Sequence, residues 1–203
     1  MSGVLILFAH PRFEKSKTNR ALLTGIEHIP GVTLHDLYEE YPDFNIDVAR
    51  ERALLSDHDV IVWHFPFFVY SAPALLKQWL DWVLEHGWAH GSHTRALQGK
   101  IVFVALTIGG ARAAYEPGGY HRFTIRDFLV PFEQTAALCR MAWLPPFAVH
   151  GTHLLTKSQL AQQAEHYQDL LKRLVAGGLP VDVLRGCDYL NDWLAAEGQR
   201  GQP

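Results

Sequence analysis

Tyr115 and His121, six residues apart, carry side chains that can donate a hydrogen bond to developing negative charge. They follow the apolar run 101–106, whose β-branched and aromatic residues predict a strand buried on both faces of a sheet. Four residues link this strand to the loop: Thr107, Ile108, Gly109 and Gly110. Glycines at the end of a central strand would let the backbone approach a flat or anionic ligand. The alternative is a plain Gly-Gly turn followed by two ordinary polar aromatic residues.

A second polar group lies between the first predicted strand, residues 4–9, and the first predicted helix, residues 20–28. The strand ends at His10, which a proline follows. Four polar residues then precede the helix: Ser16, Lys17, Thr18 and Asn19. Free N–H groups and the positive end of the helix dipole make such a place suitable for phosphate. The alternative is that these residues cap the helix, and the chain has no GxxxxGK[ST] motif for a nucleoside triphosphate.

The third predicted strand, residues 59–65, leads into an aromatic loop. Pro66 closes the strand, and the loop contains Phe67, Phe68, Val69 and Tyr70. Exposed aromatic side chains at a strand end are costly unless they cover a flat ligand or meet a partner. The alternative is that Phe67 and Phe68 point into the core, which we expect for one of the two.

The remaining segments complete an alternation of strands and helices. We expect further strands at 32–37 and 143–150, a loop at 38–45, and helices at 47–56, 74–85, 124–138 and 158–174. Prolines place the last strand at a sheet edge. Five strands alternating with helices predict an α/β fold, a flavodoxin-like three-layer sandwich with a five-stranded parallel sheet of order 2-1-3-4-5.

Residues 1–175 are expected to form this one domain, and residues 176–203 to form a C-terminal extension. Within the extension, Val181–Leu184 is expected to extend against the body. An apolar stripe at helical spacing follows: Tyr189, Leu190, Trp193 and Leu194. We expect the stripe to pack on the core or on a second subunit, and residues 198–203 to be disordered.

Composition excludes several classes of function. The 203 residues carry a formal net charge of −3, which does not suggest nucleic-acid binding. No apolar run reaches the roughly 18–20 residues of a membrane span, and the N-terminus predicts a strand and no signal peptide. Cys139 and Cys187 are distant in sequence and suggest free thiols in a reducing compartment, so we expect a cytoplasmic protein.

A glycine- and histidine-rich loop, residues 86–98, contains the one candidate metal group. His86, His90 and His93 have no accompanying carboxylate or thiolate, and the glycines give no rigid geometry. We therefore expect no metal site and interpret the loop as a mobile lid near the active site.

Three loops converge at the carboxyl ends of the first, third and fourth predicted strands. They offer an anion site with His10, an aromatic wall, and a glycine floor beside Tyr115 and His121. An anion site beside a flat slot fits a phosphorylated planar cofactor, hence a flavin. Reduced flavin carries negative charge, which a tyrosine hydroxyl and a histidine can stabilise.

Several motifs carry a specific resemblance. They are AHP at 9–11, the polar loop 16–19, FPxxxYSxPALLKQWLD at 65–81, TxGG at 107–110, and the spacing from Gly110 to Tyr115 and His121. With them the chain resembles the flavodoxin-like NAD(P)H:quinone reductases of the DT-diaphorase type. Three further stretches, 36–47, 83–91 and 139–147, are most similar to the ancillary proteins of bacterial glutathione-regulated potassium-efflux systems. The likeness covers residues 3–175.

The resemblance implies residue roles. His10 and the loop from Ser16 to Asn19 would bind the cofactor phosphate. Two segments would border the isoalloxazine ring: Pro66, Phe67, Phe68, Val69 and Tyr70, and Thr107, Ile108, Gly109 and Gly110. Tyr115 and His121 would be the catalytic, charge-stabilising pair. The better-known members have Gln-Trp at positions 68 and 69, and no adenine-binding segment is evident here, which favours FMN, with FAD as the alternative.

The implied activity is two-electron transfer from NADPH or NADH to a quinone, by a ping-pong reaction through flavin N5 in a homodimer. The alternative is a regulatory subunit that activates a potassium/proton antiporter from the cytoplasmic face of the inner membrane. A third class, an electron-carrying flavodoxin, is disfavoured by the modest net charge and by the Tyr115 and His121 pair.

Overall fold

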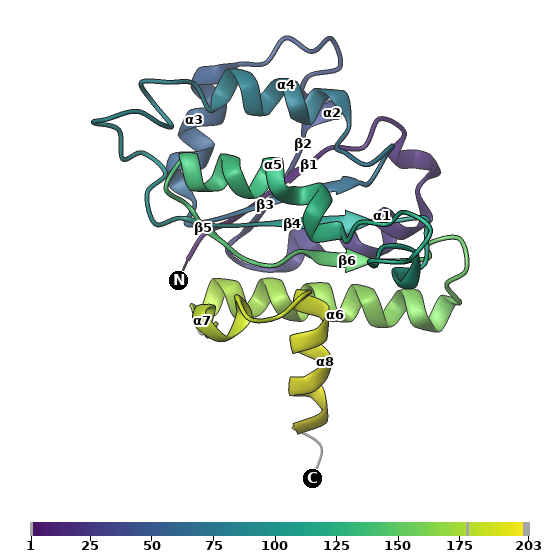
Figure 1. Cartoon of the computed structure of the whole chain (residues 1–203). Coiled ribbons are helices and arrows are strands. Elements are labelled where there is room, and N and C mark those ends of the chain that lie inside the picture. Colours follow the sequence, from purple (N-terminus) through teal and green to yellow (C-terminus); the bar gives the residue numbers. More distant parts are fainter. Residues whose placement is uncertain (1, 178, 201–203) are drawn as a thin grey trace.

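Apolar strands and amphipathic helices alternate along the chain and form one parallel sheet with helices on both faces (Figure 1). The computed structural model describes residues 2–177 and 179–200. The main strands are β1 Val4–Phe8, β2 Val32–Asp36, β3 Val60–Pro66 and β4 Ile101–Thr107. The order is β2-β1-β3-β4-β5, with β6 also paired to β4, so the predicted fold class and order are confirmed.

The fifth predicted strand is broken into two short strands. β5 (Ala142–Trp143) pairs with the beginning of β4 and β6 (Phe147–Val149) with its end. Pro145 and Pro146 separate them, because proline cannot donate to a sheet ladder. The edge position and the interruption that these prolines predict are therefore both confirmed.

The strand register aligns the ends that matter for function. Phe8 of β1 lies opposite His64 of β3, and Pro66 of β3 lies opposite Thr107 of β4. Because all pairings are parallel, the loops that follow β1, β3 and β4 leave the sheet at the same edge.

Two hydrophobic cores flank the sheet. One lies beneath the helices at the top of Figure 1: α2 Leu37–Glu40, α3 Val48–Asp57, α4 Ala74–Val83 and α5 Ile125–Leu138. The other lies beneath α1 Lys17–Leu23 and α6 Lys157–Ala176. Short 3-10 turns occur at Phe13–Lys15, Ile26–His28 and Arg112–Ala114.

The structure corrects two local predictions. Helix α1 covers Lys17–Leu23 in place of the predicted 20–28, and residues 26–28 form a separate 3-10 turn. The helix begins early because the Ser16 hydroxyl accepts a hydrogen bond from the N–H of Asn19 and caps it. The short helix α2 lies inside the predicted loop 38–45, where the Asp36 carboxylate accepts from the N–H of Tyr38. Both differences arise at caps, which side-chain periodicity does not encode.

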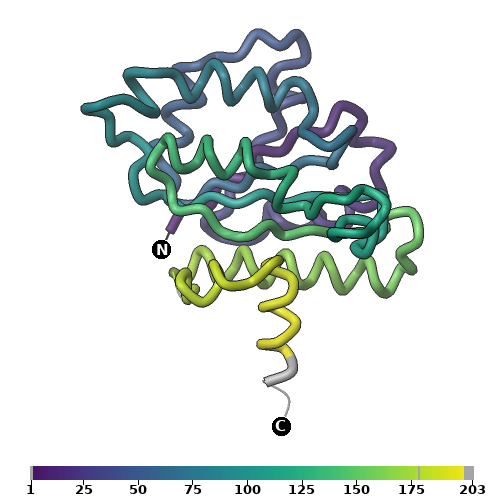
Figure 2. Tube along the Cα trace, in the orientation of Figure 1, coloured from purple at the N-terminus to yellow at the C-terminus, as the bar shows by residue number. Residues whose placement is uncertain are grey.

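The C-terminal extension packs against its own chain. Residues Val181–Leu184, expected to extend against the body, instead form the short helix α7 beside the C-terminal end of α6 (Figure 1). Helix α8 (Leu190–Arg200) projects away from the sheet (Figure 2). The predicted apolar stripe is buried: Tyr189, Leu190, Trp193 and Leu194. Residues 198–200, expected to be disordered, belong to α8, and residues 201–203 lie outside the described residues.

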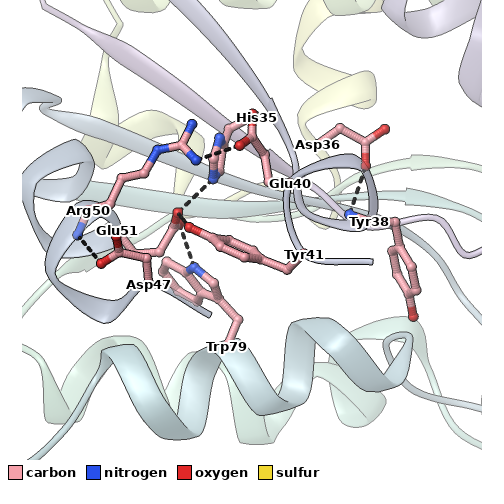
Figure 3. Close-up of polar contacts among 9 residues, drawn as sticks. All are labelled: His35, Asp36, Tyr38, Glu40, Tyr41, Asp47, Arg50, Glu51 and Trp79. Carbon is pink, nitrogen blue, oxygen red and sulfur yellow. Dashed lines mark hydrogen bonds and ion pairs between the residues drawn. The ribbon is translucent and has the colours of Figure 1, made fainter. Parts of the chain in front are cut away.

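A buried carboxylate joins the elements on one side of the sheet (Figure 3). Glu51 of α3 is fully buried, and it accepts hydrogen bonds from His35 Nε2 at 2.8 Å and from Trp79 Nε1 at 2.7 Å. The Tyr41 hydroxyl donates a third. Burial alone would raise the pKa of Glu51, but the hydrogen bonds from His35, Tyr41 and Trp79 outweigh it and lower the pKa.

This lowered pKa predicts an acid-sensitive contribution to stability. Below the ordinary value of 4.5, the unfolded chain binds a proton at Glu51 that the folded chain still excludes. The free energy of unfolding therefore falls as the pH decreases from that value through the folded pKa. Urea midpoints at about pH 6 and about pH 4 should differ less in Glu51→Gln than in the wild type. Equal differences in the two proteins would contradict this assignment.

Candidate functional site

The N-terminus of α1 presents free donors at the edge where β1 ends. The Ser16 hydroxyl oxygen accepts from the backbone N–H of Asn19 at 3.2 Å and from its Nδ2 at 2.9 Å. Within the described chain, the backbone N–H groups of Lys17 and Thr18 have no protein acceptor, and the Lys17 side chain is exposed. Both predicted interpretations of this segment are compatible, because Ser16 caps the helix while two N–H groups remain free for an anion.

A buried relay of hydrogen bonds fixes this helix end to the sheet. The Tyr167 hydroxyl donates to His64 Nδ1 at 3.1 Å, and His64 Nε2 donates to Asn19 Oδ1 at 3.0 Å. Asn19 Nδ2 also donates to Thr107 Oγ1 at 3.0 Å. Burial lowers the pKa of His64 to about 3, so the ring is neutral, as this relay requires. The Asn19 side chain is thus engaged within the protein and positions the α1 N-terminus.

Sequence reasoning did not identify His64 and Tyr167 as part of this region. The signal for His64 was available, since it is a polar residue within the apolar run of the third strand. A buried polar group needs a partner. Tyr167 carried no such signal, because it lies on the apolar stripe of α6 among leucines.

His10 is held in one tautomer. The N–H of Arg12 donates to His10 Nδ1 at 3.1 Å, and burial lowers the pKa of the ring. A neutral ring whose Nδ1 accepts carries its proton on Nε2. His10 therefore adds a donor to the first loop, and its ring lies 5.8 Å from that of Phe68.

The loop after β3 holds a strained backbone. Val69 and Tyr70 have φ angles of 45° and 66°, although Val69 is β-branched and 90% exposed. Such values cost about 1–3 kcal/mol each and concentrate at functional sites. Phe67 is buried against Phe128, whereas Phe68 is half exposed. The expectation that one of the two phenylalanines points into the core is correct, and Phe67 is that residue.

Tyr115 and His121 lie in contact. Their rings stack with centroids 4.3 Å apart and an interplanar angle of 19°. The Tyr70 hydroxyl lies 3.3 Å from His121 Nδ1, and Phe67 packs edge-on against Tyr115. Burial and then the neighbouring Tyr70 raise the pKa of Tyr115, so its hydroxyl keeps its proton at neutral pH. No acceptor for that hydroxyl lies among the residues that the structure describes.

The glycines after β4 make room for side chains of the protein itself. A Cβ on Gly110 would lie 2.9 Å from the Tyr115 ring, and one on Gly109 would lie 3.3 Å from His153 Nε2. The sequence suggested that a ligand approaches this glycine backbone, but in the structure the Tyr115 ring approaches it at Gly110. Gly110 thereby lets Tyr115 lie close to the strand end.

Ring contacts connect the three predicted loops. His10 meets Phe68 between the first and second loops, and Tyr70 meets His121 between the second and third. The predicted site residues of the three loops are thus brought to one edge of the sheet. The arrangement combines free anion donors, exposed apolar side chains and a proton-carrying hydroxyl.

The histidine-rich loop brings two of its three histidines into contact. His86 and His90 lie edge to face with ring centroids 5.5 Å apart. Among residues 2–177 and 179–200, no three His, Cys, Asp or Glu side chains are grouped to hold a metal ion. In the same residues, no helix is long and apolar enough to cross a membrane.

Comparison with known proteins shows the family to which the chain belongs. A family model described as a flavodoxin-like fold matches residues 2–174. The glutathione-regulated potassium-efflux system ancillary protein KefG of Cronobacter sakazakii is 46% identical over 176 residues, covering 86% of this chain and 96% of that protein.

Two solved structures are similar in fold and sequence. The general stress protein 14 of Treponema denticola, in complex with FMN, has a TM-score of 0.81 and 37% identity, covering 85% of this chain and 99% of that one. An NADPH-quinone reductase of P. pentosaceus has a TM-score of 0.76 and 35% identity, covering 83% and 96%.

Proposed function

Because this chain belongs to the flavodoxin-like fold family, we propose that it is an FMN-dependent NAD(P)H:quinone oxidoreductase. The observation that carries the proposal is the stacked pair of Tyr115 and His121, which places a free hydroxyl at the edge where α1 presents free N–H groups. The FMN complex and the quinone reductase among the similar structures support the same conclusion.

The residues present fit the two ends of FMN. The N–H groups of Lys17 and Thr18, the Ser16 hydroxyl and the Lys17 ammonium would hold the phosphate. Phe68, whose ring contacts that of His10, and the next residue, Val69, are exposed apolar side chains that would border the ring. When bound, the flavin supplies a hydride acceptor and donor at N5. FAD remains the alternative cofactor, although no adenine-binding segment is evident in the sequence.

Tyr115 and His121 stabilise negative charge that develops during reduction. The Tyr115 hydroxyl keeps its proton because burial raises its pKa, and it is therefore a hydrogen-bond donor. When Tyr70 donates to His121 Nδ1, the neutral imidazole carries its proton on Nε2 and offers a second donor. Tyr115 is buried, with 7% of its surface exposed, and the Phe67 ring packs edge-on against it. We propose that NADPH or NADH binds first and leaves before the quinone binds.

A second copy of the chain is expected to complete the site. Val69, in the loop after β3, exposes 90% of its surface, and Phe123, whose ring contacts that of Phe128, exposes 54%. Apolar side chains concentrated at one edge suit a partner surface. We therefore propose a homodimer.

Steady-state kinetics test the proposed order of binding. Without a quinone, the protein loaded with FMN should oxidise only about one NADPH or NADH per bound flavin. With a quinone present it should turn over, and double-reciprocal plots at several quinone concentrations should be parallel. Intersecting lines would contradict the ping-pong order, and no NAD(P)H oxidation with any quinone would contradict the proposed activity.

Gly119→Ala tests the loop that carries His121. A Cβ at Gly119 would lie 2.5 Å from the carbonyl oxygen of Ala113, which is backbone and cannot rotate away. The displaced loop should lower kcat about tenfold or more, with FMN still bound. Gly198→Ala is the matched control, because a Cβ there meets nothing within 4 Å. Equal kcat values for the Gly119→Ala and wild-type proteins would show that the loop tolerates the shift.

We propose the regulation of a potassium-efflux system as a second function, which the KefG relative supports. The chain would act as an ancillary subunit of an antiporter, bound peripherally at the cytoplasmic face of the membrane. Co-expression with such an antiporter should retain the chain in washed membranes and increase potassium efflux. A chain that washes off and leaves efflux unchanged would contradict this second function. An effect that persists in Tyr115→Phe, His121→Ala would separate regulation from catalysis.

A further inference from the structure

The C-terminal extension contacts the loop that carries Tyr115 and His121. The family model ends at residue 174, so α7 and α8 lie beyond the part that the family shares. Arg112 lies three residues before Tyr115, in the short 3-10 turn that opens this loop. Its side chain reaches the start of α8.

Two residues of the extension hold the Arg112 guanidinium. Arg112 Nη1 donates to Asp192 Oδ1 at 2.7 Å, and Arg112 Nη2 donates to Asp192 Oδ2 at 2.8 Å. The Arg112 Cζ lies 4.4 Å from the centroid of the Tyr189 ring. The bidentate pair fixes the orientation of the guanidinium plane, and the contact with the Tyr189 ring fixes the distance of the guanidinium from that ring.

The holding segment is itself anchored to the body. The N–H of Leu190 donates to the carbonyl of Pro146 at 3.0 Å, and the N–H of Ala148 donates to Asn191 Oδ1 at 2.8 Å. Asn191 Nδ2 donates in turn to Gln163 of α6 at 3.0 Å. The segment that holds Arg112 is therefore itself fixed relative to β6 and α6.

Arg112 and Tyr115 are linked in two ways. The N–H of Tyr115 donates to the carbonyl of Arg112 at 2.9 Å. Behind the Tyr115 ring lies His150, with ring centroids 5.9 Å apart, and His150 packs edge to face on Tyr189 at 5.5 Å. Burial and then Arg112 lower the pKa of His150 to about 4, so it packs there as a neutral ring.

We propose that Asp192 and Tyr189 are positioning residues, which hold Arg112 and thereby fix the orientation of Tyr115 and His121. This inference rests on the proposed function. The Arg112–Asp192 pair is nearly half exposed, and such pairs contribute little to the free energy of unfolding. Its bidentate geometry instead restricts the loop that carries Tyr115 and His121. We therefore expect the pair to affect catalysis more than global stability.

Asp192→Asn, Arg112→Lys and the double variant test the inference in the full-length protein. Each single change removes the bidentate pair while keeping side-chain size. We expect faster hydrogen exchange in residues 109–121 of the FMN-free protein, and about tenfold lower kcat with an unchanged KM for NADPH. The double variant should be no worse than either single variant, because both remove the same interaction. Asp188→Asn is the matched control, since Asp188 pairs with Arg126 of α5 at 4.0 Å.

The two readouts separate the inference from the proposed function. Unchanged exchange in Asp192→Asn and Arg112→Lys would overturn the inference, whether or not the protein is active. Faster exchange with unchanged kcat would also overturn it, because the loop would then need no positioning. A wild-type protein without NAD(P)H-dependent reduction would contradict the proposed function, and the exchange data would still decide whether the extension holds the loop.

Discussion

The double variant Tyr115→Phe, His121→Ala is expected to accept hydride from NADPH about 100- to 1,000-fold more slowly than the wild type. Removing one preorganised donor from developing charge costs this much in other enzymes. In the proposed site, the rings of Tyr115 and His121 stack with centroids 4.3 Å apart, and their two donors act as one unit, so the two losses should not multiply. Stopped-flow absorbance of the bound flavin measures the rate directly.

The same variant should bind FMN as the wild type does. The proposed phosphate donors belong to Lys17 and Thr18 of α1, which neither substitution touches. Tyr120→Phe is a suitable control, because Tyr120 lies in the same loop with 86% of its surface exposed. An unchanged reduction rate in the double variant would remove the role assigned to the pair.

Glu51→Ala is expected to lower the free energy of unfolding by about 3–5 kcal/mol, because it leaves polar partners buried without an acceptor. Glu51 is fully buried and accepts from His35, Tyr41 and Trp79, which belong to separate elements of the fold. Urea denaturation measures the loss, and the folded fraction should still bind FMN, because the three partners of Glu51 are not among the residues proposed to hold it.

A second glutamate gives the matched control. Glu40 pairs with Arg50 at the surface near the same network (Figure 3). Glu40→Gln should change the free energy of unfolding by about 1 kcal/mol or less, as exposed pairs do. A similar small loss in Glu51→Ala would contradict the structural role of the buried carboxylate.

Patterns that repeat along the chain predicted the fold well. The apolar runs predicted β1, β3 and β4, because strands buried on both faces are mostly apolar, and an alternating pattern predicted β2. The alternation with helices and the chain length then left few topologies, and the sheet order was predicted correctly. Pro145 and Pro146 signalled an interrupted edge strand, although not that each half would pair with β4.

Contacts between distant residues were not predictable from such patterns. Nothing local in the sequence joins Asn19 to His64 or Glu51 to His35, and these pairs form only when the sheet brings them together. The same holds for Arg112 and Asp192, which are 80 residues apart. A glycine at position 110 predicts that another group lies close to the backbone. The residue type alone does not show whether that group is a ligand or, as in the structure, the ring of Tyr115.

The most direct test of the proposal is the visible absorbance spectrum of the purified protein before and after addition of FMN. We predict that the protein retains or binds FMN in a ratio of about one per chain, with a perturbed flavin spectrum. We also predict that Lys17→Ala weakens binding, because it removes a charge from the proposed phosphate site. A colourless protein that leaves the spectra of excess FMN and FAD unchanged would contradict the central claim.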